Sequence, residues 1–157
     1  RQLAAALCGT AADDGALLPL ADWRFERLML LFDPDADGIH IGALMLLYLK
    51  RFAPALLAQK RVWMVRAPMG GVRVVTRATG EVEDVWAYTP EQTRTLRARA
   101  MAEPQRWQLL REWAFRGLAS LPPEVLRETC LAHATRHAAA VDDAQVQAAI
   151  DVLGRAR

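Results

Sequence analysis

The sequence predicts an α/β protein in which a Rossmann-like parallel sheet is followed by a β-hairpin and a helical tail. Two short apolar runs, at residues 28–32 and 62–65, enclose a stretch whose apolar residues recur at helical spacing. That order of strand, helix and strand is the repeating unit of a parallel sheet. Farther along, residues 72–76 and 82–88 flank a turn, and the segments that follow them have helical signals.

The first half of the chain contains the predicted parallel sheet. Residues 1–8 form an expected helix that Gly9 ends, and a loop rich in small and acidic residues follows. The run at 28–32 shows no polar alternation, which suits a strand buried on both faces. The long helix after it ends near Pro54, and a further turn leads to the second strand. The helical spacing of the long helix is carried by Ile41, Leu44, Met45, Tyr48 and Leu49.

A hairpin and a capped helix come next. Residues 72–76 alternate polar and apolar side chains, and a turn joins them to a returning strand at 82–88. The capping box at 89–92 places Pro90 at the first helical position, so a helix begins there and extends toward Ala102. Three arginines of this helix are interpreted either as a phosphate-contacting face or, more simply, as a solvated surface: Arg94, Arg97 and Arg99.

Three more helices are expected in the tail. Beyond Pro104, the first of them carries Trp107, Leu110 and Trp113, and the second begins at Pro122-Pro123-Glu124. A pair of histidines has a spacing that can bind zinc, but no third ligand is evident, so we interpret His133 and His137 as surface residues. The last helix is capped by Asp142 or Asp143 and has its apolar positions at Val146, Ala149, Ile150 and Leu153.

Composition narrows the class of protein. The 157 residues are 53% hydrophobic and 24% charged, which is ordinary for a soluble protein with a core. No apolar run approaches the roughly 20 residues of a membrane span, and Arg1 leads into a helical run rather than a signal peptide. The formal net charge of +2 neither demands nor excludes nucleic acid. Cys8 and Cys130 lack metal-ligand spacing and are interpreted as reduced thiols of a cytoplasmic protein.

Three carboxylates follow the first predicted strand, at Asp33, Asp35 and Asp37. Open α/β sheets bind their ligands at the carboxyl ends of strands. Two such charges about 4 Å apart repel by roughly 4 kcal/mol at an effective dielectric near 20, and a helix N-terminus returns only about 0.3–1 kcal/mol. A divalent cation would offset this repulsion, and hard oxygen ligands favour Mg²⁺, with Mn²⁺ or Ca²⁺ as substitutes. The alternative is a solvated turn with splayed carboxylates.

Two other acidic loops can be compared by spacing. An EF-hand that began at Asp33 would need Glu where Leu44 stands, and it would need a helix in front, so this interpretation fails. A phosphatase with an aspartyl nucleophile also has Asp-x-Asp after an apolar strand, with Asp33 as nucleophile and Asp35 as acid/base. Asp37 stands where such enzymes carry a small residue, and no Ser/Thr-then-Lys continuation follows, so the phosphatase is the less favoured enzyme.

Residues 32–41, Phe-Asp-Pro-Asp-Ala-Asp-Gly-Ile-His-Ile, resemble the Asp-x-Asp-x-Asp-Gly-x-His-Ile signature of a known domain. This is the TOPRIM domain of type IIA DNA topoisomerase B subunits, found in bacterial DNA gyrase and topoisomerase IV. Residues 115–126 are similar to the Tyr-Lys-Gly-Leu-Gly-Glu-Met-x-Pro-Glu-x-Leu motif in the tail of the same subunits. The resemblance covers about residues 3–141 in the family's order, and it does not distinguish gyrase from topoisomerase IV.

The resemblance implies that residues 1–70 are the C-terminal part of a TOPRIM domain and that residues 71–157 are the hairpin and helical tail of the B subunit. It implies Mg²⁺-assisted cleavage and religation of double-stranded DNA together with the A subunit, which supplies the nucleophilic tyrosine. The ATPase domain would belong to the rest of the B subunit. The catalytic and metal-binding residues would be Asp33, Asp35 and Asp37, whereas Arg116 and His40 are the candidates for the DNA-binding region.

The sequence departs from the family pattern at several positions. Gly42 stands where the family has Arg, Arg116 where it has Lys, and Ala119-Ser120 where it has Gly-Glu. A Glu that joins the Asp residues in the family would lie upstream of Arg1. We therefore expect the chain alone to be inactive in relaxing DNA. A catalytically inactive paralogue that binds DNA or a partner subunit is the alternative function.

Overall fold

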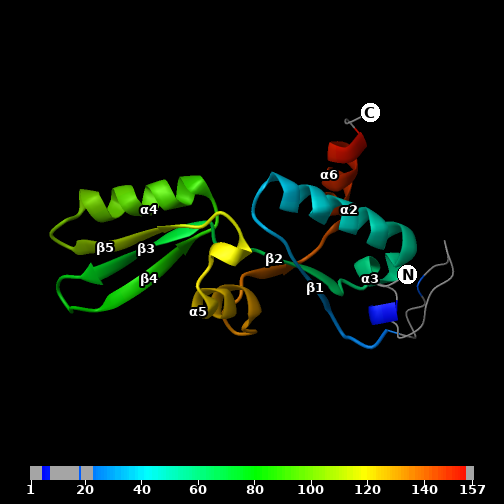
Figure 1. Ribbon diagram of the computed structural model, residues 1–157, viewed down its shortest axis with the longest axis horizontal. Helices are drawn as coiled ribbons and strands as arrows, with labels where there is room; N and C mark the ends of the chain where they lie inside the picture. The colour runs from blue at the N-terminus through cyan, green and yellow to red at the C-terminus, as the bar shows by residue number, and fades with distance from the viewer. Residues whose placement is uncertain (1–4, 8–17, 19–22, 155–157) are drawn as a thin grey trace. The chain divides into compact units, whose positions relative to one another are not determined.

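The computed structural model describes residues 5–7, 18 and 23–154. The described residues form two compact units, and Figure 1 shows the elements of each. The first unit takes residues from 1–32, 36–65 and 138–157, and the second takes 33–35 and 66–137. Both units are discontinuous in sequence. The division into 1–70 and 71–157 assigns parts of a longer protein by resemblance, and it stays a prediction.

The first unit contains a three-stranded sheet in the order β1 (Leu28–Leu31), β2 (Val62–Val65), β6 (Ala138–Ala140). Strands β1 and β2 are parallel, with Leu28 opposite Val62, and the helices α2 (Ala36–Phe52) and α3 (Pro54–Ala58) connect them. The predicted unit of strand, helix and parallel strand is therefore confirmed. Strand β6 is antiparallel to β2 and was not predicted, because a run of three alanines carries no strand signal.

The core of the first unit lies between the sheet and two helices, α2 and α6 (Asp143–Gly154), which pack against each other. Leu49 of α2 and Val62 of β2 are fully buried, and the apolar positions predicted for the last helix all belong to this cluster. The Asp142 carboxylate accepts a hydrogen bond from the Gln145 amide at 2.8 Å, so the predicted cap of α6 is confirmed. The run at 28–32 is less enclosed than predicted, since only Leu30 within it is buried.

The second unit contains an antiparallel sheet in the order β4 (Val82–Ala87), β3 (Gly70–Thr76), β5 (Trp107–Ala114), with helix α4 (Pro90–Ala102) along one face (Figure 1). Strands β3 and β4 form the predicted hairpin. The side chain of Thr89 accepts a hydrogen bond from the Gln92 amide at 3.1 Å, which confirms the cap of α4. The apolar layer between helix and sheet contains Val72, Val74, Val85, Leu96, Ala100, Trp107 and Leu109.

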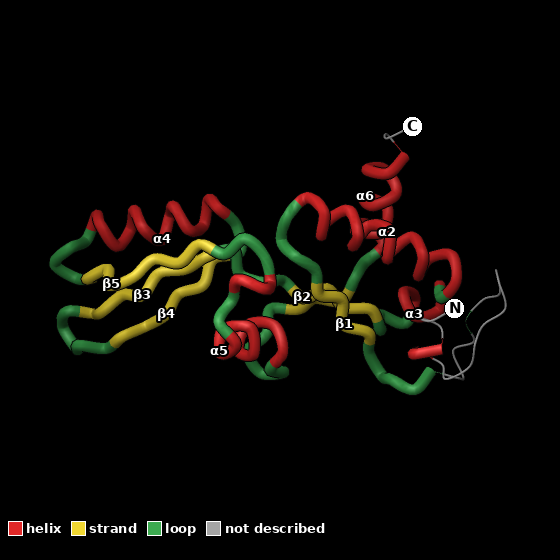
Figure 2. Tube along the Cα trace, in the orientation of Figure 1, coloured by secondary structure: helices red, strands yellow, loops and turns green. Residues whose placement is uncertain are grey.

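The prediction of a helix that carries Trp107, Leu110 and Trp113 is wrong. These residues lie on strand β5, drawn in yellow in Figure 2. Their spacing resembles one side of a helix. A β-bulge opposite Arg73 and Val74 adds a residue to β5, so Trp107 packs toward α4 while Trp113 contacts Trp86. Pairing with β3 overrides the local signal, since it satisfies a whole row of backbone groups.

The tail beyond β5 is short and partly irregular. A 3₁₀ turn at Leu118–Ser120 leads to α5 (Pro123–Leu126), which begins within the start predicted at residues 122–124 and continues as a π turn at Arg127–Leu131. Cys130 is a free, buried thiol, as predicted, whereas Cys8 lies outside the described residues. Within the part of the chain that the structure describes, no helix is both long and apolar enough to cross a membrane.

Candidate metal centre

The turn that carries Asp33, which we call the Asp turn, contacts the tail motif at residues 115–126 although the two are far apart in sequence. The backbone amide of Leu118 donates a hydrogen bond to Asp33 Oδ1 at 2.6 Å, across 85 residues of chain. Both residues belong to the second compact unit. Amide-to-carboxylate bonds of this kind are charge-assisted and stronger than neutral ones. The contact therefore fixes the direction in which the Asp33 carboxylate points.

Gly117 makes this contact possible through its lack of a side chain. A Cβ atom at this position would lie 3.0 Å from Asp33 Oδ1 and 3.3 Å from Asp33 Cγ. The backbone of Gly117 is extended, at φ 165° and ψ 173°, so other residues could adopt its conformation. The requirement for glycine here is therefore one of close approach and not of backbone freedom.

The turn that presents the Leu118 amide is closed by its own hydrogen bonds. The Ser120 hydroxyl donates to the carbonyl oxygen of Gly117 at 2.7 Å, and its Oγ accepts from the amide of Arg116 at 3.0 Å. Ser120 thus connects both sides of the turn. The side chain of Arg116 remains exposed, so its guanidinium is available to an anion.

The carboxylates suit a partly hydrated divalent cation in their chemistry. Asp33 Oδ2 accepts no hydrogen bond from any residue that the structure describes, and Asp33, Asp35 and Asp37 are all exposed. Mg²⁺ keeps several waters and is commonly held by one or two carboxylates. Over the described ranges, however, no group of three or more His, Cys, Asp or Glu side chains gathers as a set of metal ligands. A closed three-carboxylate cage is therefore not preformed there, and a site with one or two carboxylates fits better.

The other predicted site residues lie on separate elements. Asp37 is in the first turn of α2, where the helix dipole favours a negative charge, and His40 lies exposed on the same helix. His137 packs on the ring of Tyr88 with centroids 4.8 Å apart, and His133 lies in a turn, so the two histidines do not share a helix. Both histidines are exposed, as expected for surface residues.

The arginines of α4 are mostly paired with carboxylates. Arg94 bonds to Glu91 at 2.8 Å, and Arg97 lies 3.6 Å from Glu112. These pairs favour the solvated-surface interpretation of the helix. They leave α4 as a weak candidate for contact with phosphates, since each of the two positive charges already has a neighbouring carboxylate.

A cluster of side chains on the β4-β3-β5 sheet, on the face opposite α4, was not predicted from the sequence. Arg73 donates two hydrogen bonds to Asp84, at 2.6 and 2.7 Å, and both Arg73 and Arg111 lie over the indole of Trp113. The hydrogen bonds and charge of Asp84 raise the pKa of the Arg73 guanidinium above its ordinary value. Alternation of Arg and Trp along β5 was the signal, but the helical interpretation of that segment concealed it.

Together, the fold and the site define an α/β protein with a candidate metal centre at a turn that follows a strand. No family model matches the chain. It is 36% identical to the DNA gyrase B subunit of Chitinophaga japonensis over 84 residues, which cover 54% of this chain and 16% of the relative. It is 30% identical over 112 residues to a novobiocin-resistant DNA gyrase B subunit of Streptomyces niveus, covering 71% of this chain and 16% of the relative.

A third relative extends the similarity. The DNA gyrase B subunit of Thermus thermophilus is 27% identical over 124 residues, which are 78% of this chain and 18% of the relative. The chain is therefore related to the B subunits of DNA gyrase over part of its length. It spans less than a fifth of the length of these three relatives.

Proposed function

We propose that the chain is part of a type IIA DNA topoisomerase B subunit, contributing the end of the TOPRIM domain and the tail. Its role would be Mg²⁺-dependent cleavage and religation of double-stranded DNA in company with the A subunit. The observation that carries the proposal is the hydrogen bond from Leu118 to Asp33, because it joins the two segments that resemble this family. The similarity to DNA gyrase B subunits supports the same conclusion.

Each residue of the proposed site has a specific task. Asp33 would hold the cation through Oδ2, while the amide of Leu118 keeps its other oxygen in place, as partners of metal ligands commonly do. A second carboxylate, from Asp35 or Asp37, would complete the ligand set, directly or through water. Bound Mg²⁺ would supply charge stabilisation at the scissile phosphate and at the departing oxygen. Arg116 would contact a DNA phosphate, which positions the backbone without reading bases, and His40 would order the Asp turn.

The remaining parts of the reaction would come from partners. We assign the nucleophilic tyrosine to the A subunit and the ATPase to the rest of the B subunit. The holoenzyme would work in the cytoplasm. The chain by itself should then bind Mg²⁺ weakly and should not relax supercoiled DNA. Relaxation by the purified chain alone would contradict this division of labour.

The deciding experiment combines the chain with the other B-subunit segments and the cognate A subunit, and then measures cleavage of supercoiled plasmid. We expect Asp35→Ala and Asp33→Asn to lower cleavage at least about a hundredfold, since each removes a charged ligand. Asp143→Asn, on the exposed start of α6, is the matched control and should cleave normally. Equal cleavage by all four proteins, the unmutated one included, would leave the catalytic proposal without support.

A second candidate is an inactive paralogue that binds DNA or a partner subunit. The turn at Leu118–Ser120 favours it, because Ser120 closes this turn where the family has Glu. In that case the complex with DNA or the partner subunit would form, but neither the unmutated protein nor the Asp variants would support cleavage. The less favoured phosphatase predicts a fluoroberyllate adduct on Asp33, which mass spectrometry or ¹⁹F NMR would detect and which the topoisomerase proposal forbids.

A further inference from the structure

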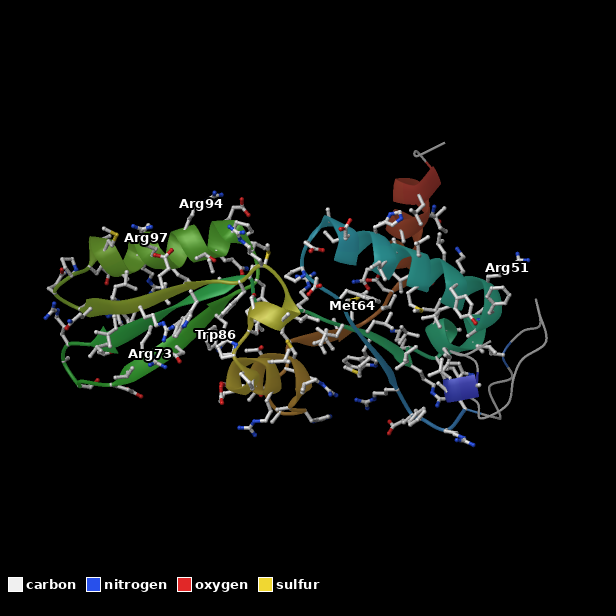
Figure 3. All side chains as sticks on the ribbon, viewed as in Figure 1. Arg51, Met64, Arg73, Trp86, Arg94 and Arg97 are labelled. Carbon is white, nitrogen blue, oxygen red and sulfur yellow. The ribbon has the colours of Figure 1, made fainter. Side chains whose placement is uncertain are left out.

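The face of the β4-β3-β5 sheet opposite α4 carries an ordered group of charged and aromatic side chains, which we call the Arg–Trp face. Figure 3 shows two of them, Arg73 and Trp86, on the side of the sheet away from α4, whereas Arg94 and Arg97 lie on that helix. The face is formed by Arg73, Asp84, Trp86, Arg111 and Trp113.

The strand register arranges this face in two rows. In the first row, Gly71 is flanked by Trp86 on β4 and Trp113 on β5, and the two indole rings meet with centroids 5.1 Å apart. A Cβ atom at Gly71 would come within 2.8 Å of the Trp86 ring, so the glycine leaves space for the indoles. In the second row, Arg73 is flanked by Asp84 and Arg111.

The second row places two positive charges directly opposite each other. Like charges at such a cross-strand position destabilise a sheet. Asp84 compensates Arg73 through two short hydrogen bonds. Arg111 makes no ion pair with any residue of the described ranges, and it is held instead over the Trp113 ring, 5.2 Å from its centroid. One guanidinium of the row is therefore preorganised and exposed with its charge uncompensated.

We propose that the Arg–Trp face binds the phosphodiester backbone of duplex DNA, with Arg111 as its principal contact. A guanidinium offers a planar fork of donors that matches two phosphate oxygens, and stacking on an indole limits the entropy lost when it binds. Trp113 lies beneath two guanidiniums and against Trp86, so its ring is not free to stack on an unpaired base. Backbone contact with a duplex suits this geometry better than single-strand binding.

The anion-binding chemistry follows from the sheet alone, whereas the choice of DNA as occupant rests on the proposed function. This surface requires neither the Asp carboxylates nor a metal ion. EDTA removes any bound metal ion, so binding measured in EDTA separates the two proposals, and the loss on Arg111→Gln reports on the Arg–Trp face. Loss of duplex binding in EDTA would overturn only the proposal for the Arg–Trp face. Failure of the cleavage test would overturn only the proposal for the metal centre.

The test is fluorescence anisotropy with the full chain and a short labelled duplex, titrated over a range of salt concentrations in EDTA. We expect Arg111→Gln to weaken binding several-fold and to reduce the slope of log K against log salt by about one, since one phosphate contact is lost. Asp84→Asn should strengthen binding, because it releases the Arg73 guanidinium. Arg111→Lys should keep the slope and lose part of the affinity.

The matched control is Arg94→Gln, which removes the same charge from α4 at a residue paired with Glu91. It should leave affinity nearly unchanged, and thermal unfolding of each variant shows that it is folded. Equal losses for Arg94→Gln and Arg111→Gln would overturn the proposal, as would an absence of duplex binding. Preference for a single strand, or Arg111-dependent binding of polyglutamate without duplex binding, would also overturn it.

Discussion

The amide of Leu118 and the carboxylate of Asp33, 85 residues apart, share a hydrogen bond of 2.6 Å. This bond connects the turn after β1 to the 3₁₀ turn after β5. A carboxylate held through one oxygen has its second oxygen directed by the same contact. The orientation of the candidate metal ligand thus depends on a backbone group of the tail, and variants of either partner should reveal that dependence.

Substitutions of Asp33 should separate its charge from its hydrogen bond. Asp33→Asn retains an oxygen that can accept from Leu118, so the free energy of unfolding should change little while Mg²⁺ affinity falls at least about tenfold. Asp33→Ala removes both the charge and the hydrogen-bond acceptor, so it should also lower the free energy of unfolding by roughly 1 kcal/mol. Isothermal titration calorimetry and urea unfolding measure the two quantities. Unchanged Mg²⁺ affinity in Asp33→Asn would remove this residue from the metal site.

Two glycine substitutions should affect different properties, because a close contact matters at one position and the backbone conformation at the other. Gly117→Ala places a Cβ atom 3.0 Å from Asp33 Oδ1, so we expect the Leu118 bond to lengthen and Mg²⁺ affinity to fall several-fold. Gly80→Ala meets no atom but imposes a φ of 71° on an L-residue, so it should cost about 1–2 kcal/mol of stability with Mg²⁺ affinity unchanged. Isothermal titration calorimetry gives the Mg²⁺ affinity of each variant, and urea unfolding gives its stability. Equal changes of both quantities in the two variants would contradict the argument that Gly117 is needed for close approach.

The cap of α6 should contribute measurably to stability. Asp142→Ala removes the hydrogen bond to the Gln145 amide and should lower the free energy of unfolding by about 1 kcal/mol. Asp143→Ala removes only a charge from the first turn and should cost about 0.3–1 kcal/mol at low salt, less at high salt. Urea denaturation at two salt concentrations distinguishes them. If Asp142→Ala and Asp143→Ala lost the same stability with the same salt dependence, the charge of Asp142 and not its hydrogen bond to Gln145 would stabilise α6.

Stability should decline at alkaline pH through Tyr88. Burial, followed by electrostatic interaction with Cys130 and Glu128, raises the pKa of this phenol above its ordinary value of 10.0. Because the folded-state pKa is the higher one, the contribution is complete below about pH 10 and is lost as pH rises through the raised pKa. Tyr88→Phe keeps the ring that packs on His137 and should flatten the alkaline decline in thermal unfolding.

Tyr48→Phe serves as the control for this pH profile, since it leaves Tyr88 in place. Its alkaline decline should match that of the unmutated protein. If Tyr88→Phe left the profile unchanged, the titration responsible would belong to another group.

The elements that depend on local chemistry were predictable. The capping threonine and proline at 89–90 begin α4, and the apolar runs of β1 and β2 enclose a helix with apolar spacing. These signals act within a few residues, so one sequence suffices to read them. Strand β5 was missed because its spacing of tryptophan and leucine imitates a helix until a bulge against β3 is included.

The sequence by itself determined which residues carry the candidate chemistry: three carboxylates after an apolar run, and an arginine followed by glycine in the tail. Only the tertiary structure decided that Leu118 orients Asp33 and that Arg111 stacks on Trp113. These contacts depend on which residues of neighbouring strands are paired and on where the chain runs after each strand. Register is fixed by the packing of a whole sheet and not by any one residue, so local patterns cannot specify it.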